Sequence, residues 1–421
     1  MNQQRQRISP KTWEQAEKLL DIWFADGQTR SNVLPFHSGQ FSHEAALFAA
    51  GIFKRGAAGI RDLDSNEETI LPPPHPKKSA SGIIIEAAWT RFLESTKIRS
   101  LNPNTVTLIV DQGVARLHPE IASDAENLGF QVMHLECNES SKNLKSVFDL
   151  YNNTRSSCQA IIAVGGGICC DVAGFVGGLL DAEIVLVPTT LLATIDAGIG
   201  GKTGVNHATA GKNQIGIFAD IASVVVIPKF LETLTPQMVR DGVGEIIKHS
   251  WLSGKFEDWY CSIERLIETQ PDSAFANESV IQLLKENIEF KARVVQADPF
   301  ERNIRAMLNL GHTVAHLVET LSLELSTGNP TQSVPSHGQA VSLGLWSLLE
   351  SGLLKNPPQG FFETLRRLNN TSGLKLPLWK LDDSRMRAIS ILLQDKKNIL
   401  PHSAAGARQI RCILPEYGCL G

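Results

Sequence analysis

Short apolar runs alternate with amphipathic helical stretches through the middle of the chain. Six runs have the length and apolar character of buried strands, at residues 83–85, 106–111, 130–135, 160–165, 184–188 and 223–228. Buried strands that alternate with helical stretches are typical of a parallel sheet covered by helices on both faces. The pattern therefore predicts an α/β domain of the nucleotide-binding type.

The second half of the chain has a different, mainly helical pattern. Apolar residues recur at helical spacing in residues 241–253, 280–298, 305–323, 338–351 and 361–368, and a last strand is predicted at 409–414. We therefore predict three parts: an N-terminal extension (1–80), the α/β domain (81–234) and a helical domain (235–421). The extension has a helical pattern over 13–24 and a polar, proline-rich stretch before residue 79, and no chemistry is assigned to it. The cleft between the two domains is the expected ligand site.

Composition narrows the class of protein. The chain has 421 residues, 43% of them hydrophobic, and a net charge of −4, which excludes global disorder and argues against a nucleic-acid partner held by phosphate contacts. No apolar run reaches the roughly 18 residues of a transmembrane helix, and no secretory signal pattern begins the chain. Seven cysteines without a CxxC pair predict free thiols in a reducing compartment. We expect a cytoplasmic protein with no nucleic-acid or membrane partner.

Three consecutive glycines, residues 165–167, follow a predicted strand and begin a predicted helix. Glycines at such a turn let backbone N–H groups approach a pyrophosphate at the helix N-terminus, although a plain tight turn has the same sequence. Asp111, at the end of another strand, could bind an adenosine ribose or could simply cap a helix. For the glycines and for Asp111 alike, the sequence leaves open both a role in cofactor binding and an ordinary structural role.

A candidate metal site combines one glutamate with two histidines. His312 and His316 are spaced i, i+4 on one helix, while Glu245 and His337 each lie near the start of another predicted helix. One Glu and two His, with open positions for substrate, are the usual composition of a catalytic zinc site. Alternatively, the two histidines bind no metal and are either solvated on the helix surface or hydrogen-bonded in the core.

Several cations lie in glycine-rich loops or beside the candidate ligands. They are Lys202, Lys212, Lys248, Lys291 and Lys396. Arg305 and Asn309 precede His312 on the same predicted helix face. If these cations converge, they form a pocket for a substrate with phosphate and carboxylate groups; otherwise they are ordinary surface lysines.

Long segments of the chain resemble 3-dehydroquinate synthase and the wider sugar phosphate cyclase family. They are residues 165–175, 187–218, 242–248, 291–298, 305–319, 337–344 and 395–397, in the family's order. The resemblance implies a Rossmann-like NAD-binding domain followed by a mainly α-helical metal-binding domain, usually in a homodimer. It also implies a lyase that uses NAD catalytically, with Zn²⁺ or Co²⁺, to eliminate phosphate from a sugar phosphate and close a carbocycle, in the shikimate pathway.

The resemblance assigns roles to individual residues. The implied NAD-binding positions are Asp111, Glu139, Lys142, Gly166, Gly167, Asp171, Thr189 and Thr190. The implied metal ligands are Glu245, His312 and His337. The implied catalytic positions are Asp196, Lys202, Lys248, Lys291, Arg305, Asn309, His316 and Lys396, with Lys212 and Asn213 binding substrate.

Two features bear on the substrate. Asn309 and His316 are typical of the family branch that makes dehydroquinate or aminodehydroquinate. Residues 179–183 are shorter and more acidic than the family's stretch here and lack its arginine, which reaches the substrate phosphate. We therefore expect weakened phosphate binding or a different substrate. The alternatives are a cyclase of secondary metabolism, an NAD-dependent metal alcohol dehydrogenase, and a scaffold that only binds NAD.

Overall fold

The computed structural model describes residues 82–207, 211–301, 304–326, 334–350, 354 and 356–371. The predicted helix over 13–24, the last strand at 409–414 and Lys396 lie outside these residues. The described residues form two compact units. The sheet unit contains residues 82–242 and 265–300, and the helical unit contains residues 243–264 and 301–371.

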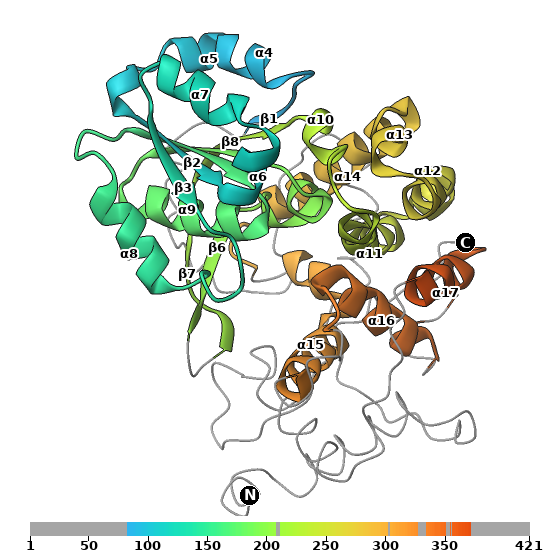
Figure 1. Ribbon diagram of the computed structural model, residues 1–421. Coiled ribbons are helices and arrows are strands. Elements are labelled where there is room, and N and C mark those ends of the chain that lie inside the picture. Colours follow the sequence, from blue (N-terminus) through green and yellow to red (C-terminus); the bar gives the residue numbers. More distant parts are fainter. Residues whose placement is uncertain are drawn as a thin grey trace, which may run out of the picture. The chain divides into compact units, whose positions relative to one another are not determined.

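The sheet unit is built on six parallel strands (Figure 1). They are β1 (Gly82–Ile85), β2 (Val106–Asp111), β3 (Gln131–Leu135), β4 (Ala160–Gly165), β5 (Glu183–Pro188) and β8 (Ile221–Val226). Their order in the sheet is β1-β8-β5-β4-β2-β3. The predicted α/β fold is confirmed, and all six predicted strands are present to within two residues at each end.

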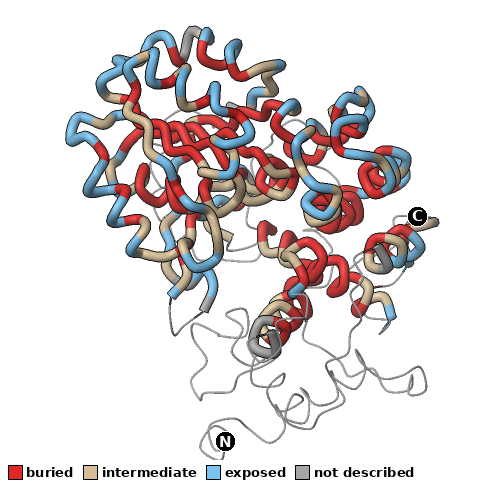
Figure 2. Tube along the Cα trace, viewed as in Figure 1, coloured by how far each residue is buried: buried red, intermediate tan, exposed pale blue. Residues whose placement is uncertain are grey.

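The central strands of the sheet are mostly buried (Figure 2). Successive residues of a strand face opposite sides of the sheet, so each strand contributes to two layers of packing. Val106, Leu108 and Val110 of β2 belong to one core cluster, and Ile109 belongs to the other. The first cluster is covered by α4 (Trp89–Glu94), α5 (Thr96–Arg99), α7 (Glu120–Asn127) and α10 (Pro228–Leu231). The second is covered by α8 (Leu144–Asn153), α9 (Gly167–Leu179) and α14 (Glu278–Ala297).

A hairpin replaces the glycine-rich loop expected around Lys202 and Lys212, and that expectation is wrong. Strands β6 (Lys202–His207) and β7 (Gly211–Phe218) pair in antiparallel fashion. Val205, fully buried, packs into the same core cluster as α9. Strand β6 is short and consists largely of glycine and polar residues, which have a low propensity for β structure. Its packing against α9 compensates for this low propensity.

The helical unit is formed by parts of α11 (Pro236–Ser253) and α12 (Phe256–Glu268) with α15 (His312–Ser326), α16 (His337–Glu350) and α17 (Phe361–Thr371). Trp251 and Phe256 pack edge-on against Phe361, with ring centroids 4.7 and 5.0 Å apart. The single helix predicted over 305–323 is wrong. A 3₁₀ helix, η3 (Ile304–Asn309), comes first, and the chain turns at Gly311, whose φ is +79°, before α15 begins.

Two expectations from composition concern the whole chain. The five cysteines within the described residues carry free thiols, as predicted. Among the helices of the described residues, none combines the length and apolar character needed to cross a membrane.

Candidate active site

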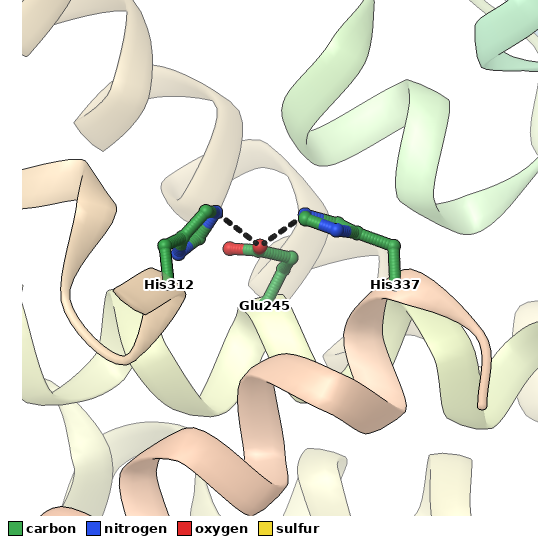
Figure 3. A group of neighbouring side chains, drawn as sticks. All are labelled: Glu245, His312 and His337. Atoms are coloured by element: carbon green, nitrogen blue, oxygen red, sulfur yellow. Dashed lines mark ion pairs between the residues drawn. The ribbon is translucent and has the colours of Figure 1, made fainter. Parts of the chain in front are cut away.

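Three predicted metal ligands converge in the helical unit (Figure 3). The Nε2 atoms of His312 and His337 lie 3.5 and 3.3 Å from the same oxygen, Oε1, of Glu245. One donor atom from each residue lies within 4.8 Å of the other two. The fold thus brings His312 and His337 to one carboxylate, although they follow Glu245 in the sequence by 67 and 92 positions.

Close packing of two helices creates this arrangement. Glu245 follows Gly244 on α11, and His337 is the first residue of α16, followed by Gly338. A Cβ atom on residue 244 would overlap the carbonyl group of Gly338. Only a glycine at 244 lets the two backbones meet at this point, and their meeting puts the carboxylate beside the imidazole of His337.

The three side chains fit a divalent metal ion. In a tetrahedral site with bonds of about 2.0–2.1 Å, neighbouring donor atoms are about 3.3–3.4 Å apart. The two measured distances to Glu245 Oε1 agree with that spacing. The Glu245 side chain is fully buried, and a buried carboxylate needs a nearby positive charge to offset its desolvation. Residue types, spacing and burial all suit zinc or a similar ion.

Charged neighbours surround the cluster. Lys248, also buried, forms an ion pair with Glu245 and donates a hydrogen bond from Nζ to the carbonyl of Leu308 at 2.6 Å. The Nδ1 atom of His337 lies 3.3 Å from Oε1 of Glu319. Burial lowers the pKa of His337, but hydrogen bonds to the Glu245 and Glu319 carboxylates outweigh burial, so the pKa is raised well above its usual value. The site therefore favours cations.

The other predicted residues of the helical unit lie on η3 and α15. Arg305 is buried at 3% exposure and Asn309 is half-buried, both on η3. The Asn309 amide donates hydrogen bonds to Glu301 and to the carbonyl of Ala306. The ring of His316 lies 5.7 Å from that of His312, centroid to centroid. Arg305 and Asn309 are thus not on the same helix as His312, contrary to the expectation.

In the sheet unit, the glycine turn puts backbone without side chains at the start of a helix. Gly166 precedes the first turn of α9, a helix of 13 residues. A Cβ atom on Gly166 would stand 3.1 Å from the Thr190 side chain, and one on Gly167 would stand 3.3 Å from Ala197. Bare backbone at the N-terminus of a helix attracts anions through its N–H groups and the helix dipole. The turn therefore fits a pyrophosphate.

Asp111 acts as a helix cap. Its Oδ1 accepts hydrogen bonds from the N–H groups of Gly113 and Val114, at 2.6 and 3.4 Å. Thr190 has a similar local role, because its Oγ1 accepts from the N–H of Ala193. Thr189 is buried behind the glycine turn. Asp111 therefore has the capping role that was the structural alternative for it, and this role uses only one of its two carboxylate oxygens.

Two polar pairs link further predicted NAD positions with the hairpin. Lys142, 8% exposed, forms an ion pair of 2.5 Å with Asp171 and donates a hydrogen bond to Asn213 Oδ1 at 2.6 Å. Burial raises the pKa of Asp171, and the Lys142 charge opposes the shift. Glu139 lies 3.4 Å from the Nζ atom of Lys212. Predicted cofactor and substrate residues thus share contacts.

The remaining predicted cations of this unit differ in environment. Lys291 is buried on α14 and donates from Nζ to the carboxylate and the backbone carbonyl of Asp196 on the π-helical turn η2 (Ala193–Ala197). Lys202 and Lys212, on the hairpin, are exposed. Lys291 is thus held in place by Asp196, whereas the two hairpin lysines lie at the surface.

The stretch that lacks the expected arginine is a tight turn. Helix α9 ends at Leu179 and β5 begins at Glu183, and the N–H of Ala182 donates to the carbonyl of Gly177 at 3.0 Å. Ala182 is 9% exposed and packs into the core. Asp181, with φ of +52°, is exposed at the tip of the turn.

Comparison with known protein families gives the identity of the fold. Residues 131–241 match the 3-dehydroquinate synthase N-terminal family, and residues 242–398 match the 3-dehydroquinate synthase C-terminal family. The chain belongs to the 3-dehydroquinate synthase family. The resemblance inferred from the motifs is thereby confirmed.

Individual relatives agree with this family. The chain is 32% identical to 3-dehydroquinate synthase from Streptococcus thermophilus, over 81% of this chain and 93% of that protein. It is 31% identical to a bifunctional 3-dehydroquinate synthase/phosphatase from Fusobacterium nucleatum, over 73% of this chain and only 46% of that protein. The chain thus spans less than half the length of the bifunctional relative.

Solved structures support the fold. One is 2-epi-5-epi-valiolone synthase from Streptomyces hygroscopicus with NAD⁺ and Zn²⁺ bound (TM-score 0.58, 22% identity, 79% of this chain and 93% of that chain). Another is glycerol dehydrogenase from Schizosaccharomyces pombe (TM-score 0.52, 15% identity, 79% and 84%). Cyclases and dehydrogenases both share the fold, so fold likeness alone does not distinguish the two chemistries.

Sequence reasoning missed two carboxylates near the site. Glu319 contacts His337, and Glu301 contacts Asn309. Glu319 follows His312 by seven residues, so the two lie on one face of a helix, and that spacing was the available signal.

Proposed function

We propose that this chain is an NAD- and metal-dependent 3-dehydroquinate synthase, a lyase that converts 3-deoxy-arabino-heptulosonate 7-phosphate (DAHP) to 3-dehydroquinate with loss of phosphate. The observation that carries the proposal is the Glu245, His312 and His337 cluster, whose donor spacing suits one divalent ion. Family membership and the cation set around the cluster support it.

We assign the metal to the cluster and NAD⁺ to the glycine turn of the sheet unit. When bound, NAD⁺ takes up and returns a hydride, and the metal polarises the substrate oxygens that it holds. Gly166 and Gly167 would hold the pyrophosphate, with Asp111, Glu139, Lys142, Asp171, Thr189 and Thr190 completing the cofactor site. Such a cofactor is regenerated in each turnover, so only catalytic amounts are needed.

The chain's own residues would bind and orient the substrate. Arg305 is buried and carries a permanent charge in a planar donor array, which suits a carboxylate or phosphate. Asn309 and His316 supply hydrogen-bonding groups beside the metal ligands. In the sheet unit, Lys291 is held by Asp196, while Lys202, Lys212 and Asn213 lie on the hairpin. Fixed donors of this kind lower a barrier by orientation and by stabilising developing charge.

The direct test is turnover of DAHP by the purified chain with Zn²⁺ and NAD⁺ well below the substrate concentration. The proposal predicts one phosphate released per 3-dehydroquinate formed, with no accumulation of NADH. His312→Ala should lose both bound zinc and turnover while keeping its circular dichroism spectrum. The control is His134→Ala, which removes an exposed histidine of β3 and should keep both.

A second candidate is a sugar phosphate cyclase of secondary metabolism. The α9–β5 turn favours it, because it has no arginine and presents Asp181 where the resemblance predicts a cation for phosphate. A panel of six- and seven-carbon sugar phosphates, with product masses, separates the two candidates. Stoichiometric NADH formation would instead indicate an alcohol dehydrogenase.

We further propose a homodimer, as the resemblance implies. Light scattering coupled to size exclusion measures the mass in solution directly, and a mass near 46 kDa would contradict the dimer.

A further inference from the structure

We infer that Glu319 is a positioning residue for the metal centre, because it holds the His337 ring in the tautomer that presents Nε2 to the ion. This inference rests on the proposed function, which requires a metal on His337. It concerns a residue that neither the motifs nor the resemblance assigned to the site.

The geometry comes from two neighbouring helices. Oε1 of Glu319 lies 3.3 Å from Nδ1 of His337, and the Glu319 side chain is only 12% exposed. Glu319 lies seven residues after His312 on α15, which is about two helical turns, so both side chains leave the same face. One face of α15 therefore carries a metal ligand and also a residue that contacts a second ligand, on α16.

The acceptor on Nδ1 decides which nitrogen binds metal. A neutral imidazole carries one proton, and the nitrogen without it is the one that can coordinate an ion. An ionised carboxylate only accepts hydrogen bonds, so Glu319 holds the proton on Nδ1 of His337. Nε2, which lies 3.3 Å from Glu245 Oε1, is then the nitrogen left to coordinate the ion.

The second histidine has the same arrangement with a different partner. Nδ1 of His312 lies 3.2 Å from the backbone carbonyl oxygen of Leu310, which is also an acceptor only. Both Nε2 atoms are thus directed to one place. The His337 partner differs because it is anionic, which makes the ring a more basic ligand.

Glu319 also changes the charge around the ion. The Glu319 carboxylate lies beside His337 and adds its negative charge to that of Glu245. Negative charge attracts a divalent cation, and the effect is strong where water is excluded. Both the orientation of the ring and the charge predict a loss of metal affinity when Glu319 is replaced.

The experiment measures the Zn²⁺ dissociation constant by competition with a chromogenic chelator, using the full chain freed of metal. Glu319→Ala should weaken zinc binding by about 10- to 100-fold, the usual effect of removing a partner of a metal-bound histidine. Glu319→Gln should weaken it less, because the amide oxygen still accepts the Nδ1 proton. Glu350→Gln is the control, since it removes an equal charge from an exposed position of α16, the helix that carries His337.

The melting temperature of each metal-free variant separates positioning from folding. Positioning predicts an ordered loss of affinity (wild type, Gln, Ala) with little change in that temperature. Equal zinc affinity in wild type and Glu319→Ala would overturn the inference, and so would an equal loss in Glu350→Gln. If Glu319→Ala does not fold, the comparison of Glu319→Gln with the control still decides. Absence of zinc binding by the wild type would instead refute the proposed function, and this inference with it.

Discussion

Replacing Gly244 by alanine should weaken metal binding by pushing two helices apart, although Gly244 is not itself a metal ligand. The new Cβ atom would stand 3.0 Å from the Cα atom of Gly338 and closer still to its carbonyl group. Carbon atoms in contact normally rest about 3.5–4.0 Å apart, so the backbones of α11 and α16 must separate by about 1 Å. Neither partner is a flexible side chain that could move aside at low cost.

The magnitude follows from this displacement. Overpacking of this kind costs about 1–3 kcal/mol of stability, and the rigid backbone on both sides favours the upper end. The distance from Glu245 Oε1 to His337 Nε2 would grow from 3.3 Å to about 4 Å, while a metal site tolerates about ±0.2 Å in its bonds. We therefore expect zinc affinity to fall at least about tenfold, or about 1.4 kcal/mol.

The assay pairs zinc competition with thermal unfolding of the metal-free protein. Gly254→Ala is the matched control: Gly254 has a φ of +67° and no atom near its built Cβ, so alanine there is strained but meets nothing. It should lose about 1–2 kcal/mol of stability and keep its zinc affinity. If Gly244→Ala binds zinc as tightly as the control does, the close approach of α11 and α16 does not set the geometry of the metal site.

Two further predictions concern buried positions. Lys248→Met should destabilise the metal-free protein by about 3–5 kcal/mol, because it removes the ammonium group that forms an ion pair with the buried Glu245 carboxylate. The double variant with Glu245→Gln should recover most of that loss in urea unfolding, and a single-variant cost below about 1 kcal/mol would contradict the role given to the ion pair. Ala182→Arg should lower the melting temperature without improving the KM for DAHP, because Ala182 is a core position within a hydrogen-bonded turn. A lower KM at unchanged stability would show that an arginine can reach the phosphate from this turn.

Local sequence was sufficient for much of the sheet unit. Strands β2 and β4 have the predicted bounds because all of their residues except Asp111 are buried, so that a mostly apolar run marks their whole length. The parallel direction of the strands followed from alternation with helices, whereas their order came from the structure. Glu245, His312, His316 and His337 became candidates because few residue types bind zinc, and the family resemblance assigned the metal to Glu245, His312 and His337.

Other features depend on contacts between distant segments. The hairpin of β6 and β7 has weak local propensity and forms because Val205 packs under α9. No local signal separates His316, one turn along α15, from His337, which reaches Glu245 only because α16 packs against α11 at Gly244. Glu319 is one glutamate among many until α15 brings it beside His337. The sequence by itself determined which chemical groups were available and in which elements they lie, because propensity and periodicity act over a few residues. Only the tertiary structure decided which groups meet, because their distances depend on how whole helices pack.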